Sequence, residues 1–185
     1  ENLRRDSEIP LPVQPVLARL GEALSGQDKT GTAFRWDPDW EGLQGTGAGR
    51  AAWARQWFAR GYRRPVQARG RKAEGYPQLC DGKPDTGVEL KKGETWVVLD
   101  LGAEAEPVSV ALFLDRPALE SAVFEASKDG GHYALLSEFP DLAGKAVLEL
   151  PLEPGAAYRM LRLILTSASE RALMREVLIG YTSSK

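Results

Sequence analysis

Few residues of this 185-residue chain could carry covalent or acid–base catalysis. The sequence holds one histidine, His132, and one cysteine, Cys80. In number alone these two would suffice for a Cys–His nucleophile pair, but they fall in separate predicted loops. Asp37 and Asp39 flank a proline in a predicted turn and make a weak acid–base pair. The sequence has no H-E-x-x-H, G-x-S-x-G or P-loop motif, so we expect that this chain is not an enzyme.

The overall composition is that of a soluble globular domain. Hydrophobic residues make up 43% and charged residues 27% of the chain, close to the usual values for such domains. No run approaches the about 18 apolar residues of a membrane-spanning helix. The net charge of −2 gives no whole-protein attraction to nucleic acid. The single cysteine excludes an internal disulfide framework, which fits a reducing compartment or an exported protein without disulfides.

The charges are unevenly distributed along the chain. Residues 61–75 carry five basic groups and one acidic group, a net of +4, whereas residues 76–185 carry 11 basic and 17 acidic groups, a net of −6. We call six cations between residues 60 and 72 the basic strip: Arg60, Arg63, Arg64, Arg69, Arg71 and Lys72. The strip could contact an anionic polysaccharide, a lipid head group or a phosphate backbone. The interpretation that we favour is a strip that is solvated or neutralised by acidic groups of the same chain.

Residues 1–60 are predicted to form a helical and irregular extension. Pro15 suits the first turn of a helix that ends near Gly26, and a second helix is predicted from about Ala48 to Arg60. The extension holds four tryptophans, Trp36, Trp40, Trp53 and Trp57. Two short helices cannot bury four indole rings alone, so we expect the extension to pack on the rest of the chain. A patch that faces a partner or stacks on a sugar is the alternative.

Residues from about 61 to 181 show the patterns of β-strands. A nearly continuous apolar run at 96–101 is followed by alternating apolar positions in 108–114, 122–127, 146–152, 161–165 and 177–181. Turn sequences with Gly or Pro separate several of these runs, which favours a sandwich or barrel. No helical crossover lies between them, which argues against a parallel βαβ fold.

Five blocks of this region resemble, in order, the motifs of the discoidin or coagulation-factor C-type family, also called galactose-binding-like domains. The blocks are Leu79–Thr86 (L-x-D-G-x-x-x-T), Glu94–Gly102 (a Trp strand ending in D-L-G), Val123–Tyr133 (with S-x-D-G), Tyr158–Leu165 and Arg175–Tyr181. The resemblance covers about residues 62–181. It implies an all-β fold, a jelly-roll sandwich of about eight antiparallel strands. We therefore predict this domain at 61–185, with the extension of residues 1–60 packed on it.

The resemblance also implies a structural Ca²⁺ at the Asp-Gly loop. Its ligands would be the Asp81 side chain, the carbonyl groups of Gln78, Lys83 and Thr86, the Thr86 hydroxyl, and Glu176 from the last strand. A hard cation takes such oxygen ligands, and this one would tie the start of the domain to its end. The alternative is a plain turn, because Asp-Gly and Lys-Pro-Asp favour turns.

Sugar sites of the family lie in loops at one end of the sandwich and commonly combine His, Arg and Asn with an aromatic ring. This chain departs from that pattern, because its one asparagine, Asn2, lies outside the resembling region. The candidate ligand-binding residues are Arg69, Arg71, Tyr76, Arg116, Glu120 and Arg171. Trp96, inside a predicted strand, is expected to belong to the core. Arg162 is expected to form a structural ion pair.

Members of the family bind glycans, lipid head groups or other proteins. The leading prediction is therefore a non-catalytic module that recognises extracellular or cell-envelope carbohydrate, as an accessory part of a larger secreted or envelope protein. We expect an extracellular or periplasmic location, and the Ala/Arg/Gly/Leu-rich, Asn-poor composition suggests a bacterial source. The main alternative is a structural or protein–protein interaction domain of a cell-envelope assembly, without a glycan ligand. Neither a nucleic-acid partner nor a transmembrane segment is expected.

Overall fold

The computed structural model describes residues 47–83, 85–142 and 144–182, with side chains from Ala52 onward. The chain divides into two compact units, residues 1–35 and 36–185, and the described residues all belong to the second. The first predicted helix, Trp36 and Trp40 lie outside the described residues. Within the described ranges, no helix is long and apolar enough to cross a membrane.

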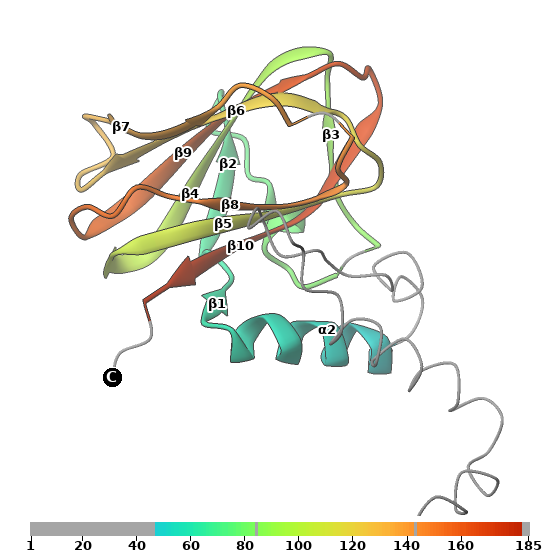
Figure 1. The fold of residues 1–185 in the computed structure, drawn as a ribbon, viewed down its shortest axis with the longest axis horizontal. Helices are drawn as coiled ribbons and strands as arrows, with labels where there is room; N and C mark the ends of the chain where they lie inside the picture. Colours follow the sequence, from blue (N-terminus) through green and yellow to red (C-terminus); the bar gives the residue numbers. More distant parts are fainter. Residues whose placement is uncertain (1–46, 84, 143, 183–185) are drawn as a thin grey trace, which may run out of the picture. The chain divides into compact units, whose positions relative to one another are not determined.

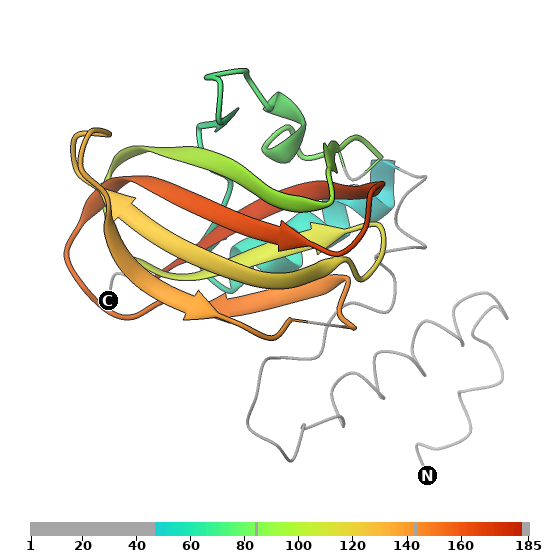
Figure 2. The same ribbon diagram turned by 90° about the horizontal axis from the view of Figure 1, so that it is seen from above.

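The described residues form ten antiparallel strands in two sheets that pack face to face (Figures 1 and 2). The first sheet contains β1 (Tyr62–Arg63), β10 (Ala172–Tyr181), β5 (Pro107–Leu114) and β8 (Val147–Pro151) in that order, with β3 (Val88–Leu90) also paired to β10. The second sheet has the order β2 (Gln67–Gly70), β4 (Gly93–Ala105), β9 (Tyr158–Ser167), β6 (Leu119–Ser127) and β7 (Ala134–Phe139). A short 3-10 turn, η2 (Pro77–Leu79), follows β2.

The core lies between the two sheets and follows the period-2 pattern of the strands. In β9, Leu161, Leu163 and Leu165 are completely buried, and Val97 and Leu99 of β4 are buried opposite them in the register. Each such side chain contributes about 1.5–3 kcal/mol through removal from water. The predicted all-β sandwich is confirmed. The short strands β1 and β3 are among the ten, where the sequence predicted about eight.

Helix α2 (Gly47–Ala59) packs on the outer face of the first sheet. Trp53 and Trp57 are 1% and 2% exposed, and both rings meet Phe113 of β5 edge to face, with centroids 5.0 and 5.1 Å away. Figure 1 shows α2 beside β1 and β10. The predicted packing of the second helix on the sandwich is therefore confirmed. By contrast, no described helix covers the outer face of the second sheet.

Candidate functional site

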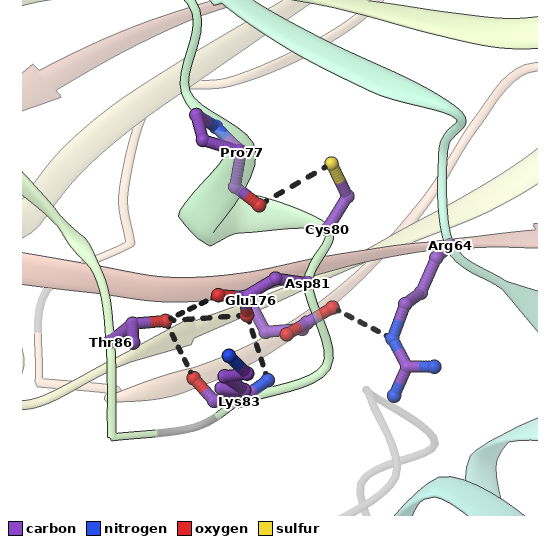
Figure 3. A network of polar contacts seen from close by, with 7 residues as sticks. All are labelled: Arg64, Pro77, Cys80, Asp81, Lys83, Thr86 and Glu176. Carbon is purple, nitrogen blue, oxygen red and sulfur yellow. Dashed lines mark hydrogen bonds and ion pairs between the residues drawn. The ribbon is translucent and has the colours of Figure 1, made fainter.

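The Asp-Gly turn after η2 gathers oxygen atoms around the Thr86 hydroxyl (Figure 3). This hydroxyl lies 3.0 and 3.3 Å from the two carboxylate oxygens of Asp81 and 2.9 Å from the carbonyl oxygen of Lys83. The backbone N–H of Lys83 donates to Asp81 Oδ1 at 2.8 Å. Gly82 adopts a positive φ of 71°, a conformation that glycine accepts without strain. The sequence D-G-x-x-x-T thus folds into a compact oxygen-lined turn.

Glu176 of β10 lies beside this turn and is completely buried. Its Oε1 accepts a hydrogen bond from Arg64 Nε at 3.1 Å, whereas its Oε2 has no hydrogen-bond partner among the described residues. Burial raises the pKa of Glu176 to about 8, and the nearby Asp81 adds to the rise, against the lowering by Arg64 and the Gly82 N–H. A buried carboxylate oxygen without a hydrogen bond, next to a second carboxylate, is a costly arrangement even though Arg64 pairs with the other oxygen.

These residues fit the donor set of a hard cation. Asp81, Lys83, Thr86 and Glu176 supply carboxylate, carbonyl and hydroxyl oxygens around one turn (Figure 3), and the orphaned Oε2 is a ligand atom that lacks a partner. Gln78 lies in η2 and has no contact with the turn in the described hydrogen-bond network. Within the described ranges, no three His, Cys, Asp or Glu side chains lie close enough together to hold a metal ion. The site would therefore depend on neutral oxygens as well as two carboxylates.

Three of the predicted ligand-binding residues, Arg69, Arg71 and Tyr76, lie on β2 and the loop after it. Arg69 lies on the outer face of the second sheet, exposed beside Val98 of β4. Arg71 follows β2, and its guanidinium lies over the ring of Trp96. Tyr76 is half-buried and packs against the core, so much of its ring is unavailable to a ligand.

The other three, Arg116, Glu120 and Arg171, belong to loops and strand starts at one end of the sandwich. The β5–β6 and β9–β10 loops meet there, since the Ala168 N–H donates to the Ala118 carbonyl at 2.9 Å. Arg116 pairs with its neighbour Asp115. No described contact joins this group to the group on β2. The structure therefore distributes the six predicted residues over two places.

The basic strip also divides into two parts. Its first half is engaged within the chain: Arg60 pairs with Glu149 at 2.6 Å, Arg63 donates to backbone carbonyls, and Arg64 pairs with Glu176. Its second half, Arg69, Arg71 and Lys72, forms no ion pair among the described residues. Neutralisation by an acidic group therefore describes Arg60 and Arg64, whereas Arg69, Arg71 and Lys72 are solvent-exposed.

The expectation that Trp96 belongs to the core is wrong. Its neighbours Val97 and Leu99 point inward and are completely buried, so the alternation of β4 directs Trp96 to the outer face of the second sheet. There it is half-buried and takes no part in either hydrophobic core cluster. Its indole N–H donates to Glu94.

Trp96 is the centre of a row of arginines and aromatic rings. The guanidinium carbons of Arg71 and Arg162 lie 4.7 and 4.9 Å from the Trp96 ring centroid, and that of Arg162 lies 4.2 Å from the ring of Tyr133. Arg162 is also paired with Glu125, which confirms the predicted ion pair. We call Arg69, Arg71, Trp96, Arg162 and Tyr133, which lie on or beside this outer surface, the Trp96 face. A ring with charged hydrogen-bonding groups around it can hold a ligand that has both an apolar face and polar groups.

Comparison with protein-family models and with curated proteins gives no match, whereas solved structures share the fold. A pectin-binding carbohydrate-binding module matches with a TM-score of 0.54 at 18% identity, over 66% of this chain and 94% of that module. A labelled variant of chitosan-binding module 1 from a chitosanase/glucanase of Paenibacillus sp. IK-5 matches with a TM-score of 0.53 at 14% identity, over 64% and 99%. The CBM32 module of AlyQ, solved with 4,5-unsaturated mannuronic acid, matches with a TM-score of 0.52 at 15% identity, over 64% and 96%. At these identities the likeness shows the fold, and it confirms the predicted discoidin-like, galactose-binding-like sandwich.

Proposed function

We propose that the protein is a non-catalytic carbohydrate-binding module that holds its ligand on the Trp96 face. The observation that carries this proposal is the position of Trp96. A half-buried indole ring stands on the outer face of the second sheet, with guanidinium groups of Arg71 and Arg162 against it. A sugar ring has one apolar face and a rim of hydroxyls, which match an indole ring bordered by hydrogen-bond donors and acceptors.

The fold supports the same proposal. Each of the three compared sandwiches is a carbohydrate- or chitosan-binding module by its own description. Because a fold alone does not determine function, the Trp96 face supplies the residue-level argument. An extracellular location, where polysaccharide ligands occur, belongs to this proposal. So does a role as the binding part of a larger protein.

The experiment that tests the function is a glycan-array screen of the full chain, with the melting temperature of the same sample followed in parallel. We expect selective, saturable binding to a limited group of glycans. A silent array from a folded sample would contradict carbohydrate binding within the range of glycans displayed. Pull-down of an envelope protein by that sample would then favour the assembly function instead.

We further propose that Ca²⁺ binds at the Asp-Gly turn and links it to β10. Asp81, Thr86 and Glu176 would provide side-chain oxygens, and Lys83 and Gln78 would provide carbonyl oxygens. The bound ion would neutralise the two carboxylates and give Glu176 Oε2 the partner that it lacks. Its role would be structural, since it would fasten the loop before β3 to the last strand.

Addition of Ca²⁺ should raise the melting temperature by roughly 5–10 °C when its concentration exceeds the dissociation constant about 100-fold. The replacement Asp81→Asn should remove most of this rise, because a hard cation loses a charged ligand. The matched control is Glu89→Gln, which removes a charge from an exposed position of β3 and should keep the rise. Differential scanning calorimetry of the wild type and of the two variants, each with Ca²⁺ and with EDTA, measures these melting temperatures. A wild-type melting temperature that is equal in Ca²⁺ and EDTA would contradict the metal site and leave a plain turn closed by Arg64.

A further inference from the structure

We infer that the saccharide held by the Trp96 face is acidic: its ring lies against Trp96 while its carboxylate binds between Arg69 and Arg71. This inference rests on the proposed function and specifies the chemical class of its ligand. It follows from Arg71, which contacts the ring and forms no ion pair among the described residues, and from the way Arg71 differs from Arg162, the other arginine at Trp96. The acidic groups near the ring and Arg69 include Glu94, which accepts the indole N–H, and Asp100, whose pKa Arg69 helps to lower.

The segment from β2 to Tyr76 carries a local excess of positive charge. It holds three cations, Arg69, Arg71 and Lys72, against one anion, Glu74. Arg69 donates to the neutral amide oxygen of Gln67, from Nε at 3.1 Å and from Nη2 at 2.5 Å. Neither Arg71 nor Lys72 forms an ion pair in the described part of the chain. The region that follows, residues 76–185, has a net charge of −6, so this basic corner stands out against an acidic body.

The two arginines at Trp96 differ in how firmly they are held. Arg162 lies in the middle of β9, is paired with Glu125 and stacks on Tyr133. Arg71 is exposed, follows the end of β2, and has the Trp96 ring as its described contact. An exposed cation–π contact is weak, so Arg71 can leave the ring when a ligand arrives. Arg162 then remains as part of the fixed surface.

This arrangement selects a carboxylate. A guanidinium offers parallel N–H groups that match the two oxygens of a carboxylate. Arg69 of β2 is paired across the sheet with Val98 of β4, which is paired in turn with Arg162 of β9. Trp96 lies two residues before Val98 on the same face of β4. A uronic acid combines a carboxylate with a pyranose ring that has an apolar face, so it satisfies the arginines and the indole together. A neutral hexose would leave Arg71 without a counter-charge, whereas Arg69 already interacts with Asp100.

The test compares acidic trisaccharides with their own neutral esters. Trigalacturonate and trimannuronate are titrated into the full chain by isothermal calorimetry, alongside the corresponding methyl esters, at low and high NaCl. We expect at least one acid to bind at least about tenfold more tightly than its ester, with an affinity that falls as salt rises. The replacement Arg71→Gln should lower the affinity for that acid by about tenfold and leave the affinity for its ester nearly unchanged. The control Lys145→Gln, which removes a cation from the β7–β8 turn, should bind like the wild type.

The outcomes separate this inference from the proposed function. Equal affinity for acid and ester, or an Arg71→Gln variant that binds the acid normally, would overturn the acidic ligand. Binding of neutral glycans on the array with no binding of either acid would overturn it too, while the proposed function would stand. A protein that is folded and silent towards every glycan would overturn both.

Discussion

Replacement of Trp96 by alanine is expected to reduce glycan affinity by about 30-fold or more, the loss that follows when a central aromatic contact worth about 2 kcal/mol is removed. Two guanidiniums, those of Arg71 and Arg162, approach the Trp96 ring on the outer surface of the second sheet. Its removal takes away the apolar platform and also the surface on which Arg71 rests. The affinity of Trp96→Ala for the best glycan from the array, measured by calorimetry, checks this result.

The fold should survive the same replacement, because Trp96 lies outside both core clusters. Arg162 keeps its partners Glu125 and Tyr133 without the indole. Trp96→Phe, which keeps a smaller ring, should retain a measurable part of the affinity. If Trp96→Ala melted near the wild-type temperature and still bound the glycan with full affinity, the binding site would have to lie elsewhere, with the end loops around Arg116, Glu120 and Arg171 as the next place to search.

The second large effect is expected at the interface between α2 and the first sheet. Trp57 is buried against Phe113 and Tyr62, with ring centroids 5.1 and 4.9 Å away, and the Arg60 guanidinium lies 4.6 Å from its ring. Trp57→Ala should lower the free energy of unfolding by about 3–5 kcal/mol. A domain of this size has a total of about 5–15 kcal/mol, so the variant should melt roughly 6–20 °C lower.

Two control variants show whether the interface causes this loss. Gln56→Ala changes an exposed neighbour on α2 and should leave the melting temperature within a few degrees. Trp57→Phe keeps an aromatic ring and removes the indole N–H that has no partner among the described residues, so its loss should be much smaller than that of Trp57→Ala. A Trp57→Ala chain that melts with the wild type would show that α2 does not stabilise the sandwich.

The sequence predicted the strands and their buried residues wherever one face of a strand is buried and the other is exposed to solvent. In β9 the leucines recur at every second position, with Arg162 and Ile164 between them, and all three enter the core. Short strands at sheet edges and beside β10 gave no such signal. The four residues of β2 include a glutamine, an arginine and a glycine, and β3 has three residues. Neither pattern distinguishes a strand from a loop before the neighbouring strand is known.

Trp96 was misplaced for a physical reason. The run at Trp96–Leu101 is apolar at nearly every position, so it contains no alternation to indicate which residues point inward. The register with β9, which pairs Val97 with Leu163 and Leu99 with Leu161, decides the direction. Such pairing connects residues far apart in the chain and cannot be derived from local pattern.

The candidate metal site and the basic strip each combine features that are local in sequence with contacts between distant residues. The turn at Asp81 and Thr86 is local in sequence, and its motif could be identified from the residues alone. The contact between Arg64 and Glu176 joins positions 112 residues apart, and it needed the fold. The division of the basic strip into a half with partners inside the chain and a half without ion pairs among the described residues also depends on partners, such as Glu149, that lie far away along the chain.

The most direct test of carbohydrate binding at the Trp96 face is a titration followed by ¹H–¹⁵N nuclear magnetic resonance, with attention to the indole N–H signals. The Trp96 signal, assigned from its absence in Trp96→Phe, should shift in a saturable way as the best glycan from the array is added. The signals of buried Trp53 and Trp57, on the other side of the sandwich, should stay in place. A glycan that binds while the Trp96 signal does not move would contradict the proposed site.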